Sequence, residues 1–491
     1  MKGITVRLKD IKGTYLNGKK LAAFRGRLLI LGFGGVGQTM LPIVLRHLII
    51  DPHKITVMEK DNHTDLFYRK YNGTGVKYII REIVKANMDR ELSLYLGPGD
   101  MLINLSLNID GIEIVEWCLK HDVLYTDTSI ERWPDQPDET IPELADRTLY
   151  IAHTRIRDIT AKWKNKGATA LVTNGANPGL VSQFTKAALL DIADAMHLDV
   201  EIPHTQPEWA NLMMATGTKV VHIAERDTQI MNIPRLPGEF VNTWSCEGFQ
   251  AEGRAPSELG WGTHEKPAPN NGFVHREGTG NAAYLKTPGV ATMAKSWVPI
   301  GGAYNGFVVQ HSESVTMSNY FTVTKDDRPL YRPTVHYVYC PCDAAIASVH
   351  EFRGKELTLQ DKMRVAKTEI IGGMDELGVL LLGHGMNGWW YGSQMSIGEA
   401  NAVLPGEGPT TIQVAANMLA GVVWMLKNPR KGYTEPEELP FDFILDIARP
   451  YLGTMESVRT DWTPLADRNT LFNTYLDPRH PWRFENFQIS S

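Results

Sequence analysis

Six residues near the start of the chain, GFGGVG at positions 32–37, match the pattern GxGxxG. They stand directly after a short apolar run and directly before a mostly apolar helical pattern, which is the context that makes this pattern informative. The first glycine permits a tight turn, the second lets the backbone approach a pyrophosphate, and the third lets helix and strand pack closely. The helix N-terminus adds amide donors and a positive dipole. The sequence therefore predicts a dinucleotide-binding turn with these contact residues: Gly32, Gly34, Gly35, Val36 and Gly37.

An acidic residue, Glu59, stands about 20 positions beyond the glycines, at the end of the next apolar run. At a strand end, its carboxylate can accept hydrogen bonds from both ribose hydroxyls of a dinucleotide and would repel a 2′-phosphate. The sequence therefore favours NAD over NADP as the cofactor. Asp61 could share or take this role, because the pattern does not fix the last residue of the strand.

Two later apolar runs, MLINLSLN (101–108) and VLYTDTS (123–129), are typical of buried strands, with a helical segment between them. Repetition of strand and helix predicts a parallel sheet. The loops that follow the later strands of such a sheet border the nicotinamide of a bound dinucleotide. From this topology we expect four more residues at the cofactor: Ser106, Thr126, Asp127 and Thr128.

Acidic and aromatic side chains dominate a second group of candidate residues, most of which follow the predicted sheet in the chain. They occur in HIAERDTQ (222–229), NTWSCEGFQAEGRAP (242–256) and VVQHSESV (308–315), and in TNGANPG (173–179) and TDTSIERWP (126–134) on the sheet side. The candidates in these strings are Glu225, Trp244, Glu252, His311, Asn177 and Glu131.

These strings, together with GFGGVGQ and GPTTIQVAANM (408–418), closely resemble bacterial homospermidine synthases, and the likeness runs through nearly the whole chain. The resemblance implies a Rossmann-type domain related to saccharopine dehydrogenases, an inserted substrate domain, a homodimer and tightly held NAD. It also implies that five residues line a diamine pocket: Asn177, Glu225, Trp244, Glu252 and His311. Asn177 precedes Pro178 and Gly179, which favour a turn, and the two roles are compatible.

The implied reaction explains why a pocket would need these residue types. Putrescine carries two ammonium groups near neutral pH, so the pocket must neutralise the distant one while the reacting amine loses its proton. NAD takes a hydride from the carbon that bears the neutral amine and leaves an iminium. Hydrolysis releases ammonia, a second putrescine or a spermidine condenses with the aldehyde, and the retained NADH returns the hydride. The reaction has no net redox change.

Roles can be assigned to the candidate residues on this basis. The indole face of Trp244 would stabilise the iminium by about 2 kcal/mol. Glu225 and Glu252 would anchor ammonium groups and move protons, Glu131 would be a further acid near the nicotinamide, and His311 would shuttle protons. The sequence does not rank the acids as general bases.

Two other functions compete with this interpretation. A saccharopine-type or carboxyspermidine-type dehydrogenase would need Arg or Lys to hold substrate carboxylates. Arg226 and Arg254 stand beside the candidate residues, so this function remains an alternative. A non-catalytic protein that binds NAD or polyamines would share the pockets but not the turnover. The joint presence of Glu225, Trp244, Glu252 and His311 favours retained chemistry.

The elements that must position these residues indicate an α/β protein, with a Rossmann-type parallel-sheet domain and a second α+β domain for substrate binding and dimerisation. We expect the NAD-binding domain at residues 1–160 and the second domain at 161–395. Residues 396–491 should then return and pack on the first domain.

The composition narrows the function further. A formal charge of −6 over 491 residues gives no basic surface for nucleic acid. The opening MKGITVRLKDIKG has no apolar core, and no run approaches the roughly 18 uninterrupted apolar residues of a membrane span, so we expect a cytoplasmic protein. The four cysteines are too few and too irregularly spaced for a disulfide framework, so we expect free thiols. Cys340 and Cys342 lack a second pair or a histidine cluster nearby, and we predict no metal site.

Overall fold

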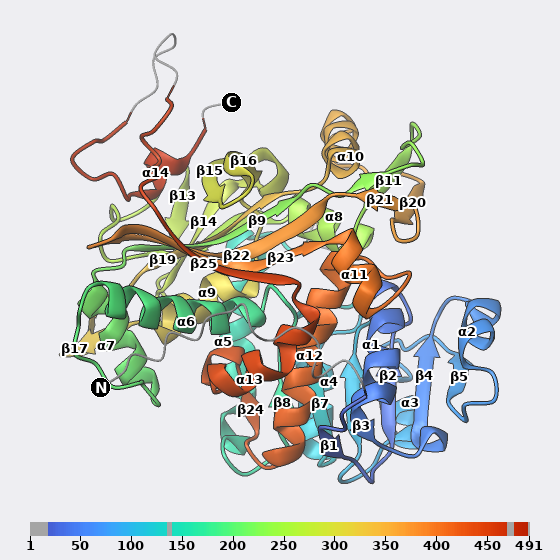
Figure 1. Cartoon of the computed structure of the whole chain (residues 1–491). Coiled ribbons are helices and arrows are strands. Elements are labelled where there is room, and N and C mark those ends of the chain that lie inside the picture. Colours follow the sequence, from blue (N-terminus) through green and yellow to red (C-terminus); the bar gives the residue numbers. More distant parts are fainter. Residues whose placement is uncertain (1–17, 135–139, 469–475, 490–491) are drawn as a thin grey trace.

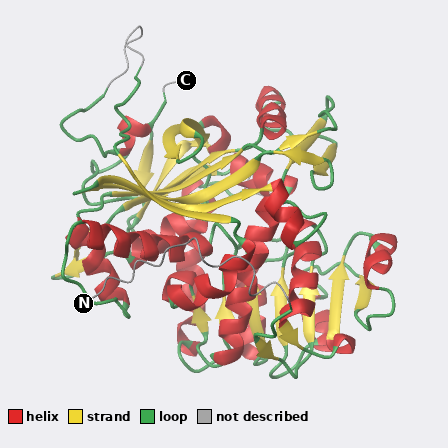
Figure 2. Ribbon diagram, viewed as in Figure 1, coloured by secondary structure: helices red, strands yellow, loops and turns green. Residues whose placement is uncertain are grey.

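Two large β-sheets, with helices between and around them, dominate the computed structural model (Figure 1, Figure 2). The structure describes residues 18–134, 140–468 and 476–489. The opening segment considered above, residues 1–13, therefore lies outside the described residues.

The first sheet has seven parallel strands in the order β24-β8-β7-β6-β2-β4-β5. Apart from β24, this is the strand order of a Rossmann-type sheet, in which the order of the strands reverses between the neighbouring strands β2 and β6. The strands are β2 (Leu28–Leu31), β4 (Ile55–Glu59), β5 (Lys77–Ile80), β6 (Met101–Asn104), β7 (Leu124–Asp127), β8 (Ala170–Leu171) and β24 (Tyr433–Thr434). The helices that belong to this part are α1 (Gly35–His47), α2 (Thr64–Tyr71), α3 (Met88–Tyr95), α4 (Gly111–Lys120) and α5 (Leu149–Thr160).

The turn between β2 and α1 needs glycine for two different reasons. Gly32 has a φ of +91°, a left-handed conformation that favours glycine. At Gly37, a Cβ atom would lie 2.3 Å from the carbonyl oxygen of Gly32, so a side chain there would push the helix away from the turn. The predicted strand, glycine turn and helix are confirmed.

The second sheet is mixed and has ten strands, in the order β13-β14-β12-β19-β9-β22-β23-β25 with β15 and β16 joined through β19. At its centre β9 and β19 are parallel, and their neighbours are antiparallel. The strands are β9 (Val220–Asp227), β12 (Pro256–Gly260), β13 (Gly272–Val274), β14 (Ala282–Pro288), β15 (Met293–Val298), β16 (Gly302–Phe307), β19 (Thr334–Cys340), β22 (Met374–His384), β23 (Asn387–Ser396) and β25 (Thr454–Thr460).

Smaller elements complete the described chain. Four two-stranded sheets pair β1 (Ala22–Ala23) with β3 (Leu48–Ile49), β10 (Ile230–Met231) with β21 (Ile370–Gly372), β11 (Glu239–Asn242) with β20 (Lys362–Val365), and β17 (Val323–Lys325) with β18 (Arg328–Tyr331). The remaining helices are α6 (Leu180–Ala195), α7 (Gln206–Thr216), α8 (Cys246–Arg254), α9 (Ser312–Tyr320), α10 (Asp343–Gly354), α11 (Ile397–Val403), α12 (Pro409–Lys427), α13 (Phe441–Ala448) and α14 (Phe484–Phe487).

The strands do not divide along the chain quite as the sequence pattern indicated. β8 lies beyond residue 160 and yet completes the parallel sheet, and β24 joins that sheet from the C-terminal part. Helix α12 packs against α1, as expected of a returning segment, but β25 goes to the second sheet. The C-terminal part thus contributes strands to both sheets. The sequence did not predict this division, because short buried strands such as β8 and β24 carry no periodicity that would assign them to one sheet.

Helix α12 is long and apolar enough to cross a membrane by length and composition, and among the described residues it is the single helix of this kind. Its window is 89% buried inside the protein. It packs against α1 and α13, which is the environment of a core helix.

The close approach at Gly37 leads to a stability prediction. Gly37→Ala should lower the free energy of unfolding by about 1–3 kcal/mol, because the added methyl group meets backbone rather than a flexible side chain. Gly354→Ala is the matched control, since a Cβ there has open space and the residue ends helix α10. Urea unfolding of both variants checks this, and a wild-type midpoint for Gly37→Ala would contradict it.

Candidate active site

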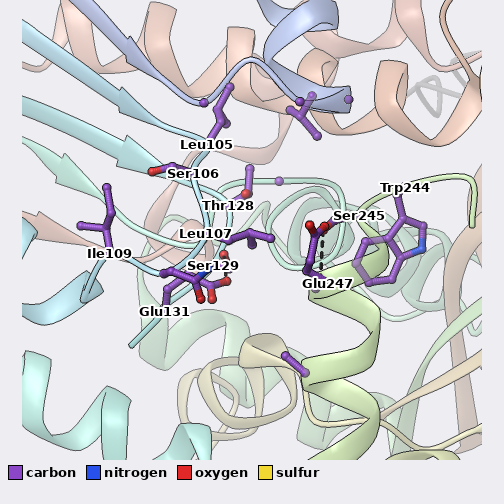
Figure 3. A pocket seen from close by; sticks show the side chains of 18 of the residues that line it. Leu105, Ser106, Leu107, Ile109, Thr128, Ser129, Glu131, Trp244, Ser245 and Glu247 are labelled. Atoms are coloured by element: carbon purple, nitrogen blue, oxygen red, sulfur yellow. Dashed lines mark hydrogen bonds between the residues drawn. The ribbon is translucent and has the colours of Figure 1, made fainter. Parts of the chain in front are cut away.

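A cavity of about 510 Å³ lies where the carboxyl ends of the parallel strands face the second sheet. Figure 3 shows Ser106 and Thr128 from the parallel-sheet loops together with Trp244 from the second part of the chain. The topological switch point of such a sheet is where ligands bind, and the volume is in the range of small-molecule sites. The predicted residues that line the cavity are Gly32, Gly34, Gly35, Val36, Glu59, Ser106, Thr128, Glu131, Asn177, Glu225, Trp244, Glu252 and His311.

At one end of the cavity, the glycine turn has the form of a dinucleotide cradle. A Cβ on Gly34 would meet nothing within 4 Å, so the backbone there is open to a ligand. The Glu59 carboxylate accepts from the backbone N–H of Phe33 at 2.5 Å and from that of Lys60 at 2.7 Å, which holds it beside the turn. Asp61 also lines the cavity.

Three of the predicted cofactor residues do not line the cavity. Gly37 has the packing role described above. Thr126 is fully buried within β7, and Asp127 accepts from the Tyr125 hydroxyl at 2.7 Å and from the Thr173 N–H at 2.5 Å. For Thr126 and Asp127 the prediction differs from the structure, because β7 continues through Asp127 and the cavity begins at Thr128.

At the other end, Glu225 is held by two hydrogen bonds to the same carboxylate oxygen. Asn177 donates through Nδ2 to Oε2 at 2.6 Å, and the Tyr337 hydroxyl donates to Oε2 at 2.6 Å. Glu225 is only 2% exposed, and this burial raises the pKa of its carboxyl well above the usual range, although both donors oppose the shift. The NPG turn and the pocket contact of Asn177 therefore coexist.

His311 lies between two carboxylates. Its Nδ1 is 2.7 Å from Oε2 of Glu313, and its Nε2 is 3.5 Å from Oε1 of Glu252. Burial alone lowers the pKa of His311, but the charges of Glu313 and Glu252 outweigh burial and hold the pKa well above the ordinary value. The imidazolium form is thus favoured. Burial in turn raises the pKa of Glu252, and the histidine opposes that rise.

Trp244 presents a partly exposed indole at the cavity. Its Nε1 donates to the Tyr339 hydroxyl at 2.9 Å, and its ring packs beside Phe249 with 5.7 Å between centroids. These contacts hold one edge of the indole, and the side chain lines the cavity. Glu131, from the loop after β7, accepts from the Ser129 hydroxyl at 2.8 Å, and burial raises the pKa of its carboxyl.

Sequence reasoning missed three residues that support this arrangement. Tyr337 and Tyr339 lie on β19, in a buried strand whose pattern carries no functional signal. Glu313 lies two positions after His311, and this spacing was the signal that could have revealed it.

Arg226 and Arg254, which could have held the carboxylates of an amino-acid substrate, do not line the cavity. Strand alternation places Arg226 on the face of β9 opposite Glu225, where it donates to the carbonyl of Gly301. Arg254 is likewise absent from the lining. Among the lining residues that the structure describes, Lys and Arg occur only near Glu59, as Lys60 and Arg81. Within the same described ranges, no three His, Cys, Asp or Glu side chains group as metal ligands.

Two relatives match nearly the whole chain. The homospermidine synthase of Blastochloris viridis is 41% identical over 475 residues, covering 94% of this chain and 97% of the relative. That of Mesorhizobium japonicum is 39% identical, covering 94% of this chain and 96% of the relative. The chain belongs to the homospermidine synthase family.

Structure and domain comparisons agree with membership in the homospermidine synthase family. A crystal structure of the homospermidine synthase of Legionella pneumophila in complex with NAD has a TM-score of 0.88 at 39% identity, covering 96% of this chain and 100% of that chain. Two domain models also match, the saccharopine dehydrogenase NADP binding domain over residues 28–171 and the saccharopine dehydrogenase C-terminal domain over residues 175–461. The family and the fold predicted from the sequence are confirmed.

The buried carboxylate of Glu225 gives a pH-dependent stability prediction for this homospermidine synthase family member. A pKa that is raised on folding means that the folded state binds the proton more tightly, so stability falls as pH rises through the raised pKa. Glu225→Gln keeps an acceptor for Asn177 and Tyr337 but has no charge to bury. Its free energy of unfolding should exceed the wild-type value by a margin that grows between about pH 5 and about pH 8.

Denaturant unfolding at several pH values measures this margin. Glu247→Gln is the control, because it removes a cavity carboxylate that is exposed. A margin that is constant with pH, or one that shrinks as pH rises, would contradict the burial argument.

Proposed function

We propose that this protein joins two diamine molecules, with putrescine as the first substrate, to give sym-homospermidine and ammonia with the help of bound NAD. The observation that carries the proposal is one cavity with a dinucleotide cradle at one end and Glu225, Trp244, Glu252 and His311 at the other. The described lining near these four residues has carboxylates and no Lys or Arg, which suits a dication and not an amino acid.

The residues of the turn fit a dinucleotide. Gly34 and Gly35 would face the pyrophosphate, Ser106 and Thr128 the nicotinamide half, and Glu59 the adenine ribose. Although the matching domain model is named for NADP, the carboxylate at Glu59 favours NAD, and the relative from Legionella pneumophila was crystallised with NAD. When bound, NAD supplies a hydride acceptor for the oxidation and, once reduced, the hydride donor for the final reduction.

Glu225 is the residue that we assign to the reacting amine. Asn177 and Tyr337 occupy its Oε2, so Oε1 is the oxygen for a substrate ammonium. A carboxylate whose pKa lies above the usual range is a better match for proton transfer near neutral pH than an exposed one. It can take the proton that the amine must lose before oxidation.

The group formed by His311, Glu252 and Glu313 is suited to the distant ammonium and to proton movement. Its two carboxylates exceed the single imidazolium charge, which leaves a negative site for a substrate cation. His311 can pass a proton between the substrate side and Glu313. We assign Glu131, which lines the cavity close to Thr128, to proton transfer at the nicotinamide end.

Trp244 is assigned to the cationic intermediate. Its indole face can stabilise an iminium by about 2 kcal/mol when water is excluded. Water then attacks the iminium to give an aldehyde and ammonia, the second amine condenses with loss of water, and the resulting imine is reduced. Two putrescine molecules become homospermidine and ammonia, so atoms and electrons balance. Spermidine in place of one putrescine, a homodimer and a cytoplasmic location remain predictions from the sequence.

The decisive test is product analysis of purified protein with putrescine and NAD. We expect homospermidine and ammonia in equal amounts, without net accumulation of NADH. Steady NADH formation that requires an amino-acid conjugate would assign the protein to the saccharopine-type dehydrogenases, and binding of NAD and putrescine without any turnover would assign it to non-catalytic binders.

A tryptophan substitution tests the iminium role. Trp244→Ala should lower kcat by about tenfold or more, because about 2 kcal/mol of stabilisation is lost, whereas the affinity for NAD should change little. Trp244→Phe should retain part of the rate, since phenylalanine keeps a weaker π-face. Trp389→Phe, a change outside the cavity lining, serves as the control. An unchanged rate in Trp244→Ala would remove this residue from the mechanism.

A further inference from the structure

The glycine turn is covered by residues from the second part of the chain. A Cβ on Gly35 would lie 3.4 Å from Cγ2 of Thr411 and 3.9 Å from Cγ1 of Val365. Both side chains line the cavity, Val365 at the end of β20 and Thr411 in the first turn of α12. We call Val365 and Thr411 the roof of the turn. The roof therefore borders the part of the cavity in which a ligand at Gly34 and Gly35 would lie.

One buried carboxylate ties this roof to the parallel-sheet part. Glu407 is 2% exposed and lies just before α12. Its Oε1 is 3.1 Å from Nζ of Lys70 on α2, and its Oε2 is 3.0 Å from Nζ of Lys367, two residues after the roof residue Val365. The hydroxyl of Thr39 on α1 donates to the same Oε2 at 3.1 Å. One side chain therefore joins α1, α2 and both segments that carry the roof.

The same group of contacts reaches the glycine turn itself. Lys367 also donates from Nζ to Oε1 of Gln38 at 2.9 Å, and Gln38 donates from Nε2 to the carbonyl oxygen of Phe33 at 2.9 Å. Phe33 lies between Gly32 and Gly34, so the chain of contacts from Glu407 ends at the backbone of the turn. The cavity lining contains neither Glu407 nor Lys367, so neither residue is placed to touch a ligand.

We infer that Glu407 and Lys367 are positioning residues that hold the roof closed over the bound dinucleotide between its reduction and its reoxidation. This inference rests on the proposed function, in which the same NADH must survive the exit of ammonia and the entry of a second amine. If NADH left in that interval, the aldehyde could not be converted into homospermidine and the reaction would end as a net oxidation. Retention of the cofactor is therefore a requirement of the chemistry, and these contacts supply it from outside the cavity.

The ion pair between Lys367 and the buried Glu407 makes the inference testable, because the lysine can be replaced. Lys367→Met removes one cation, breaks the contact to Gln38 and leaves the pair between Lys70 and Glu407. The holoenzyme carrying NADH is mixed with excess NAD, and the loss of bound-NADH fluorescence gives the dissociation rate. We expect this rate to rise about tenfold or more in Lys367→Met, the scale of a broken charged contact. Lys355→Met, which breaks an ion pair with Glu351 on helix α10, should leave the rate unchanged.

A second readout uses the complete reaction with putrescine. Lys367→Met should release NADH and aminoaldehyde beside homospermidine, whereas wild type and Lys355→Met should not. Thr39→Val removes the neutral hydroxyl that contacts Glu407, the roof residue Thr411 and the carbonyl of Gly35, and it provides a milder second variant if Lys367→Met does not fold. Folded Lys367→Met or Thr39→Val with a wild-type NADH dissociation rate would overturn the inference. If wild type makes no homospermidine, the proposed function fails instead, and the dissociation rates still decide whether these residues retain the dinucleotide.

Discussion

Burial of helix α12 between the two sheets is the constraint on which the site depends. Its side chains donate hydrogen bonds toward both sheets. On the side of the parallel sheet, Asn417 donates to the carbonyl of Gly175 at 2.7 Å. On the side of the second sheet, Gln413 donates to the hydroxyl of Ser393 on β23 at 2.9 Å, and Thr410 donates to Asp375 on β22 at 2.6 Å. Such polar contacts in a buried helix fix its rotation, because any other rotation would leave buried donors unpaired. With α12 fixed, Thr411 is held over Gly35, and the glycine turn faces Glu225 and Trp244 across the cavity.

Electrostatics inside the cavity follow from the same burial. Low exposure raises the pKa of Glu225, Glu252 and Glu131, and it would lower that of His311 if Glu313 and Glu252 were not beside it. Carboxylates in such a site favour either a proton or a cation. A diamine brings two positive charges to the place where the protein has concentrated acids, so substrate binding and charge compensation are the same event in the proposed function. An amino-acid substrate would add a carboxylate near Glu225, Glu252 and His311, where the described lining has no arginine or lysine to meet it.

Much of this site could be recognised in the sequence, and the failures have local causes. The glycine turn was predictable because strand, glycines and helix are contiguous, so local geometry determines them. Asn177, Glu225, Trp244, Glu252 and His311 were identified through a family resemblance, since a single glutamate among many has no signal of its own. Thr126 and Asp127 were placed at the cofactor from topology alone, which does not tell where the strand ends; both lie within β7, and the cavity lining begins at Thr128. Tyr337 was missed because a tyrosine in a buried strand looks like core.

The sequence by itself determined the class of fold, the position of the dinucleotide turn and the family, all of which depend on contiguous patterns or on similarity along the chain. Tertiary structure alone decided which strands complete each sheet, since β8 and β24 have two residues each and no periodicity. It also decided that Glu313 stabilises the charged form of His311, and that Glu407 meets Lys70 across 337 positions of sequence. Such contacts arise when distant segments bury the same surface, and burial is a property of the packed chain rather than of any stretch of it.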